Sequence, residues 1–123
     1  MGIFRNEAFV SHAGLRLLFK IECDELDQED IETVAAIIGR SFRFKDVVGI
    51  PRGGLRLAEA LKKFCQPEES DTLLVDDVST SHGSMEEARK EISEPVRGVV
   101  IFARGQCPSW IKPIFQLAEW ARP

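Results

Sequence analysis

Short apolar runs alternate along the chain with stretches of helical periodicity. Residues 46–50, 72–75 and 96–102 are short, mainly apolar runs rich in β-branched residues, which is typical of parallel strands covered on both faces. Residues 15–21 place apolar and basic side chains on opposite sides, which predicts a half-buried edge or antiparallel strand. Because helical segments separate the apolar runs, we expect a single α/β domain over residues 1–123. Its central sheet should be mainly parallel, flanked by helices and joined by right-handed crossovers.

The first helix carries a start signal in the sequence. Asp27 is placed as N-cap with Asp30 three residues later, and Leu26 and Ile31 have the spacing of a hydrophobic staple. The apolar positions after this start recur at helical spacing. They are Ile31, Val34, Ala35 and Ile38.

Two more helices and a tail complete the expected layout. A second helix is predicted over 55–64, after the turn that ends the first apolar run. A third helix should follow the second run, because Ser84 and Glu87 have capping-box spacing. Residues 110–120 are expected to form a compact tail that closes the chain.

Composition limits the classes of protein that need to be considered. The 123 residues are 44% hydrophobic and 29% charged, as in ordinary globular domains. No apolar run approaches the roughly 20 residues of a membrane helix, and the N-terminus lacks the pattern of a secretory signal. We therefore expect a cytoplasmic protein with no membrane partner. A net charge of −4 argues against a nucleic-acid partner.

The stretch 73–84, LLVDDVSTSHGS, runs from an apolar strand into Asp76 and Asp77 and then into a polar turn. If the turn opens a helix, the backbone amides of residues 80–84 would point at an anion such as a phosphate monoester. The two acids would repel a phosphate, but carboxylates accept hydrogen bonds from a vicinal diol or hold a phosphate-bound cation. A sugar phosphate satisfies both halves of the motif. The alternative is that the acids end a strand and the serines cap a helix.

A second candidate anion site follows the preceding strand, at Pro51-Arg52-Gly53-Gly54. Glycines let a ligand approach the backbone closely, and a guanidinium can fork onto phosphate oxygens. The alternative is a tight turn with a solvated arginine. Because ligands in open parallel sheets bind beyond the carboxyl ends of the strands, both turns would face one crevice. The patterns G-x-x-x-x-G-K-[ST] and G-x-G-x-x-G are absent, which argues against a triphosphatase or nicotinamide site.

These motifs resemble those of the type I phosphoribosyltransferase family. LLVDDVSTSHGS is similar to its signature of apolar residues, two acids and a Thr/Ser/Gly phosphate turn, and GIPRGG is similar to its pyrophosphate loop. The order of elements resembles that of orotate phosphoribosyltransferase. Residues 9–21 are similar to its base-loop strand, with His12, Gly14 and Arg16 as a candidate base pocket, although a lone histidine beside a strand is more often a surface residue. VVIFAR and IKPIFQLAEW are similar to its last core strand and hood closure, which implies a small hood formed from the N- and C-terminal segments.

The resemblance implies an enzyme that transfers ribose 5-phosphate from phosphoribosyl pyrophosphate (PRPP) to a nucleobase. Asp76, Asp77 and Arg52 would be the catalytic residues, the acids on the ribose hydroxyls and the arginine on the pyrophosphate. Magnesium would arrive with PRPP, with these two acids as the candidates for any direct contact. A homodimer is also implied. The implied substrate-binding residues are Pro51, Arg52, Gly53, Gly54, Asp76, Asp77, Ser79, Thr80, Ser81, His82, Gly83 and Ser84.

Three positions depart from the family pattern. His82 replaces a glycine of the phosphate turn, and Leu17 and Lys20 replace the usual serine and tyrosine of the base-loop strand. Only residues 65–71 join the second helix to the motif strand, where the family has a further strand and a mobile catalytic loop. Three hypotheses therefore stay open. The first is transfer to a nucleobase, with an orotate-like pyrimidine favoured, and the second is a non-catalytic PRPP- or nucleotide-binding module. The third is a purely structural partner protein.

Overall fold

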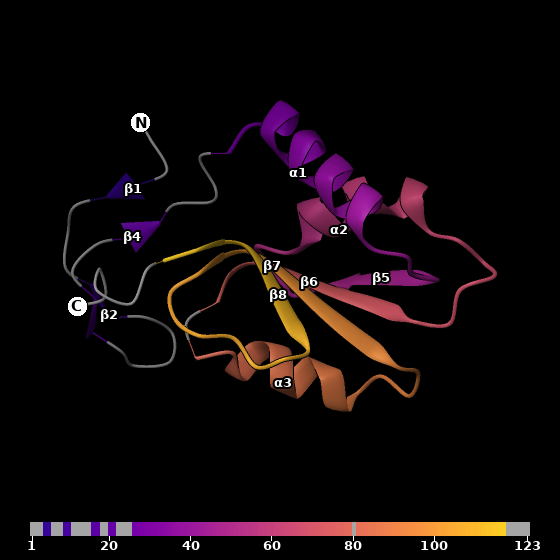
Figure 1. Ribbon diagram of the computed structural model, residues 1–123. Coiled ribbons are helices and arrows are strands. Elements are labelled where there is room, and N and C mark those ends of the chain that lie inside the picture. Colours follow the sequence, from indigo (N-terminus) through magenta and orange to yellow (C-terminus); the bar gives the residue numbers. More distant parts are fainter. Residues whose placement is uncertain are drawn as a thin grey trace.

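The computed structural model describes residues 26–79 and 81–117, together with the backbone of four short N-terminal strands. These strands pair antiparallel, β1 with β4 and β2 with β3, and they lie beside the end of the sheet to which its strands run (Figure 1). Their bounds are Phe4–Arg5 (β1), Phe9–Val10 (β2), Arg16–Leu17 (β3) and Lys20–Ile21 (β4). The strand predicted over 15–21 is thus described in two pieces, and residues 15, 18 and 19 lie outside the described part.

A four-stranded parallel sheet in the order β5-β6-β7-β8 forms the centre of the fold, which confirms the predicted α/β class. Its strands are Asp46–Gly49 (β5), Thr72–Ser79 (β6), Val96–Ala103 (β7) and Ile111–Gln116 (β8). β6 is longer than predicted, because it pairs with β7 as far as Ser79 and Ala103. Asp76 and Asp77 consequently lie within the strand and not after it.

The fourth strand, β8, was not predicted from the sequence. Residues 111–116 were assigned to a tail and hood, but they pair with β7 from Ile111 to Gln116. Pro113 interrupts the strand pattern and has no N–H to donate, which is tolerated at a sheet edge. In the part of the chain that the structure describes, β8 pairs with β7 on one side only, so the proline leaves no ladder hydrogen bond unmade on its outer side.

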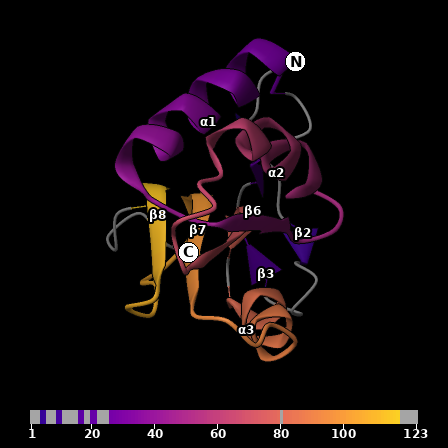
Figure 2. The same cartoon turned by 90° about the vertical axis from the view of Figure 1, so that its right-hand side faces the viewer.

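The helices cover both faces of the sheet (Figures 1 and 2). α1 (Gln28–Ser41) and α2 (Leu55–Leu61), which continues into the 3₁₀ helix η2 (Lys62–Phe64), lie on one face, and α3 (Gly83–Lys90) lies on the other. Side chains of β6 alternate between them: Leu73 and Val75 pack with α1 and α2, and Leu74 packs with α3. Full burial of each such side chain is worth about 1.5–3 kcal/mol.

The two crossovers that contain a helix have opposite hands. β5 leads through α2 to β6, and β6 leads through α3 to β7, so both steps move the same way across the sheet. The two helices lie on opposite faces, and one crossover is therefore left-handed. The prediction that the crossovers are right-handed is therefore wrong for one of these two connections. α2 is kept on its face by Leu57 and Leu61, which share a core cluster with α1.

The predicted start of α1 is confirmed, whereas that of α3 is wrong. Asp27 caps α1 and forms a capping box with Asp30, and Leu26 and Ile31 belong to one hydrophobic cluster. α3 begins at Gly83 after an N-cap, His82, that makes no side-chain capping bond. The Ser84 capping box does not form because the helix has already begun one residue earlier. In the part of the chain that the structure describes, no helix has the length and apolar character to span a bilayer.

Candidate functional site

The turn after β5 is pressed against the acid pair of β6. A Cβ built on Gly53 would lie 2.1 Å from Oδ2 of Asp77, and one on Gly54 would lie 2.5 Å from the carbonyl oxygen of Val75. Real Cβ atoms do not approach so closely, so a Cβ on Gly54 would clash with fixed backbone atoms, and one on Gly53 would force the Asp77 carboxylate or the turn to move. The Ile50 N–H also donates to the Val75 carbonyl at 2.9 Å. The PRGG turn and the acids therefore form one continuous surface at the carboxyl ends of β5 and β6.

The two carboxylates are anchored by the backbone of their own strand. The Asp77 N–H donates to Oδ1 of Asp76 at 2.8 Å, and the Val78 N–H donates to Oδ1 of Asp77 at 2.7 Å. Burial, and then the adjacent Asp77 charge, raises the pKa of Asp76 to about 8. At neutral pH the unliganded pair therefore holds a proton on Asp76. A ligand that donates hydroxyl protons or brings a cation would favour loss of that proton.

Arg52 is exposed at the tip of the PRGG turn, next to exposed Pro51. The peptide bond between these two residues is cis. The exposed guanidinium can fork onto oxyanions. Its turn ends where α2 begins, after Gly54, whose N–H donates to the Ile50 carbonyl at 2.8 Å.

The predicted phosphate turn leads from the end of β6 into α3. His82 adopts the left-handed conformation with φ 65°, and among the described non-glycine residues it alone has a positive φ. Its Nδ1 bonds to the buried Ser79 hydroxyl at 2.5 Å, and its Nε2 donates to the Gln106 carbonyl at 3.1 Å. Thr80 lies outside the described residues. The first amides of α3, from Gly83 and Ser84, are unpaired donors of the kind that bind anions.

The candidate base pocket is only partly within the described residues. His12 and Gly14 lie outside them, and Arg16 is described only as a backbone position of β3, paired with Val10. The structure thus brings together the PRGG turn, the acids and the start of α3. The base pocket predicted for His12, Gly14 and Arg16 stays a prediction.

The sequence reasoning missed Arg104, which directly follows β7. This side chain is 5% exposed, and its backbone N–H donates to the Ser79 carbonyl at 3.0 Å. Arg104 stands after an apolar strand, as the polar turns stand after the two preceding strands. Applying the strand-end rule to β7 would have added it to the candidate residues.

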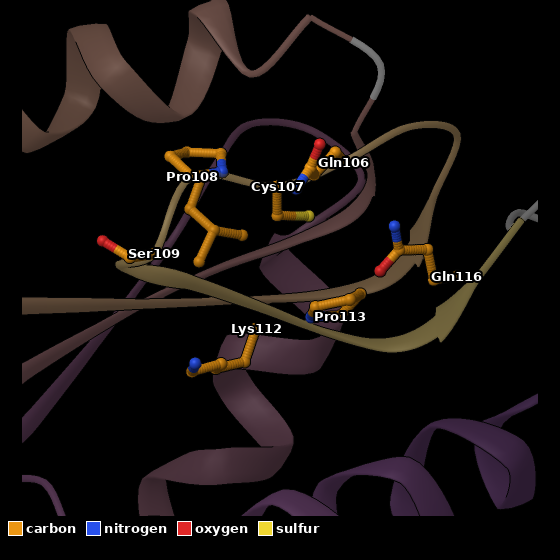
Figure 3. Close-up of a pocket in the computed structure, with 8 residues that line it drawn as sticks. Gln106, Cys107, Pro108, Ser109, Lys112, Pro113 and Gln116 are labelled. Atoms are coloured by element: carbon orange, nitrogen blue, oxygen red, sulfur yellow. The ribbon is translucent and has the colours of Figure 1, made fainter. Parts of the chain in front are cut away.

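A cavity of about 480 Å³ lies beside the candidate site, between the loop after β7 and β8 (Figure 3). None of the predicted site residues lines it. The lining residues are Gln106, Cys107, Pro108, Ser109, Ile111, Lys112, Pro113 and Gln116. The candidate site therefore lies at the carboxyl ends of the strands and not in this cavity.

No known family model and no curated protein sequence matches this chain. Solved structures do match. UMP synthase of Leishmania donovani has a TM-score of 0.73 at 17% identity over 94% of this chain. Orotate phosphoribosyltransferase of Aeropyrum pernix has a TM-score of 0.72 at 18% identity over 93% of this chain and 88% of its own. The chain has a type I phosphoribosyltransferase fold.

A third structure with this fold is the orotate phosphoribosyltransferase of Mycobacterium tuberculosis in complex with Fe(III) dicitrate. Its TM-score is 0.67 at 12% identity, over 98% of this chain and 93% of its own. The present chain covers 34% of the Leishmania UMP synthase chain, so it spans about a third of that protein. Identities this low establish the fold alone.

Proposed function

We propose that this protein binds PRPP in the crevice at the carboxyl ends of β5 and β6. The contact between Gly53 and the Asp77 carboxylate carries this proposal, because it joins the PRGG turn and the acid pair into one site. The phosphoribosyltransferase fold supports the same location. In this arrangement the acids accept hydrogen bonds from the ribose hydroxyls, the PRGG turn holds the pyrophosphate, and the start of α3 holds the 5-phosphate.

Each group has the chemistry that its role requires. Arg52 is exposed and can fork onto pyrophosphate oxygens, which need a fixed positive charge. Asp76 is protonated at neutral pH before the ligand arrives, because burial raises its pKa to about 8. Two ribose hydroxyls donating to the pair, or a cation beside it, would displace that proton.

Magnesium fits this site as a companion of the substrate. In the described part of the chain no group of three or more His, Cys, Asp or Glu side chains is arranged to hold a metal. Asp76 and Asp77 can supply one or two oxygen ligands, which is the usual protein share when phosphates provide the rest. When bound, the ion would neutralise charge on the departing pyrophosphate.

The reaction proposed for this site is transfer of ribose 5-phosphate to a nucleobase. The bond between ribose C1 and the pyrophosphate oxygen breaks, pyrophosphate leaves with the bonding pair, and a base nitrogen bonds to C1 with its lone pair and gives up its proton to water. Arg52 stabilises the charge that develops on the leaving group. The likeness to orotate phosphoribosyltransferases favours a pyrimidine such as orotate. We also propose that the protein works in the cytoplasm and that it is a homodimer. Sedimentation analysis of the purified protein tests the homodimer.

A second candidate function is non-catalytic binding of PRPP or a related nucleotide. Residues 65–71 run directly from η2 to β6, and they are tied to the start of β5. Gln66 N–H donates to the Phe44 carbonyl at 2.9 Å, and Lys45 N–H donates to the Asp71 carbonyl at 2.7 Å. This connection lies at the amino ends of the strands, opposite the acids, and cannot cover the site.

Calorimetric titration with PRPP and Mg²⁺ tests the proposal. Asp77→Asn keeps the shape of the side chain but removes an anionic acceptor, and it should weaken binding by about 1–3 kcal/mol. Asp71→Asn is the matched control, because this acid lies at the opposite end of the sheet and should leave the affinity unchanged. Equal affinities for wild type and Asp77→Asn would place PRPP elsewhere. Pyrophosphate release with a panel of bases then distinguishes transfer from binding alone.

A further inference from the structure

His82 is the most unusual residue of the phosphate turn. Its backbone occupies the left-handed region that a side chain other than Gly, Asn or Asp seldom adopts. Its ring reaches in two directions, to the Ser79 hydroxyl at the end of β6 and to the Gln106 carbonyl in the loop after β7. The ring therefore links the end of β6 to the loop that follows β7.

The two partners of the ring determine where its protons can lie. The Gln106 carbonyl only accepts, so Nε2 must carry a hydrogen in every charge state. In the neutral ring, Nδ1 is then bare and accepts the hydrogen of the Ser79 hydroxyl. When Nδ1 gains a proton, it donates to the Ser79 oxygen instead, since a hydroxyl both donates and accepts. The imidazole can thus become charged without losing either hydrogen bond.

We infer that His82 couples phosphate binding to proton uptake: a dianion held at the start of α3 draws one proton from solvent onto Nδ1 of His82. This inference rests on the proposed function, which supplies the phosphate. A positive charge on His82, one residue from the first amides of α3, favours a bound dianion. His82 is therefore a specificity-determining residue that favours dianions over monoanions.

The charged groups on the surrounding elements are few. Asp76 and Asp77 precede the turn on β6, Arg104 follows β7, and Glu86 lies one turn along α3. The Glu86 carboxylate already accepts from Trp110 Nε1 at 2.7 Å and lies 4.0 Å from Arg89. Burial raises the pKa of Asp76 to about 8, so this group would also favour anions as the pH falls, and the test must separate its effect from that of His82.

Sulfate is a suitable probe because it remains a dianion from pH 5.5 to pH 8, so that any proton taken up lands on the protein. In wild type, lowering the pH over this range should raise sulfate affinity by about three- to tenfold more than in His82→Gly. Glycine fits the left-handed backbone without strain, and the variant keeps Asp76. His82→Asn also tolerates this backbone, so it provides a second uncharged variant should the glycine loosen the turn.

Proton uptake is measured directly by calorimetry in buffers of different ionisation enthalpy. Wild type should take up a fraction of a proton per sulfate at pH 7, and both variants should take up less. The chain has two histidines, so His12→Gln assigns the NMR signal of the His82 ring, whose titration midpoint should rise with sulfate. Equal pH dependence in wild type and both variants, or an unmoved midpoint, overturns the inference. If neither sulfate nor ribose 5-phosphate binds at any pH, the proposed function fails instead.

Discussion

The α-carbon of Gly53 faces the carboxylate of Asp77 so closely that an added methyl group would stand 2.1 Å from Oδ2. This contact makes the conformations of the PRGG turn and of the acid pair on β6 depend on each other. We expect Gly53→Ala to force the turn away from β6, with a loss of about 1–3 kcal/mol of unfolding free energy, the cost of overpacking. Urea denaturation measures this loss.

Gly83→Ala is the control for that substitution. A Cβ on Gly83 would meet only the Ser81 hydroxyl oxygen, at 3.6 Å, which is ordinary van der Waals contact. Gly83 is also the first residue of α3, where alanine is a better helix former. The Gly83→Ala variant should therefore be at least as stable as wild type. If both alanine variants are equally stable, the turn is not held against Asp77.

The raised pKa of Asp76 predicts a pH-dependent stability. Because its pKa is raised from 3.8 to about 8 in the folded chain, the folded state binds more protons than the unfolded state between these values. Stability must then fall as the pH rises through this window. From pH 6 to pH 8, wild type should lose up to about 2 kcal/mol more unfolding free energy than Asp76→Asn, which has no titrating group there.

Urea unfolding of both proteins at pH 6, 7 and 8 checks this expectation. The amide of the Asp76→Asn variant would keep an oxygen that accepts from the Asp77 N–H, so the backbone anchor of the pair is retained. All other titrating groups are common to the two proteins and cancel in the difference. Parallel pH profiles would mean that Asp76 is ionised in the folded chain at neutral pH.

Arg52→Ala should separate the two ends of the proposed ligand. Arg52 belongs to the turn assigned to pyrophosphate, whereas the 5-phosphate is assigned to the start of α3. The substitution should weaken pyrophosphate binding by about 1–3 kcal/mol, the scale for hydrogen bonds to charged groups, and leave ribose 5-phosphate binding nearly unchanged. Competition titrations with both ligands measure the two affinities. Equal losses would place Arg52 outside the pyrophosphate subsite.

The sequence was informative wherever a local pattern determined the structure. The α1 cap at Asp27 follows from side-chain bonds within four residues, and the apolar runs predicted three of the parallel strands. β8 could not be predicted in this way, because its proline disrupts the strand pattern and its place depends on its pairing with β7. The hand of the crossovers likewise depends on which face each helix covers.

The candidate site shows the same division. The acids and the PRGG turn were identified from their positions after apolar runs, yet the contact between Gly53 and Asp77 depends on the pairing of β5 with β6. The hydrogen bonds of His82 to Ser79 and Gln106 could not be predicted from the sequence either. Gln106 is 24 residues from His82, and only the parallel pairing of β6 and β7 brings their following loops together.

Slow turnover is the expectation that decides between the two candidate functions. The connection over residues 65–71 is short and is hydrogen-bonded to Phe44 and Lys45 at the amino ends of the strands. A lid over the acids would have to come from the opposite end of the sheet. In the family a mobile loop at this point of the chain closes over the transition state, excludes water and brings donors to the developing pyrophosphate charge.

We therefore expect the isolated protein to bind PRPP but to release pyrophosphate far more slowly than an ordinary enzyme. Losing one preorganised donor costs about 10²–10³ in rate, and losing closure adds to that cost. The measurement is single-turnover release at saturating PRPP and Mg²⁺, with orotate, uracil and purine bases in turn. A rate near 10 per second, roughly the median for enzymes, with any base would show that no lid is needed. A rate that rises steeply with protein concentration would instead show that a second copy supplies the missing donors.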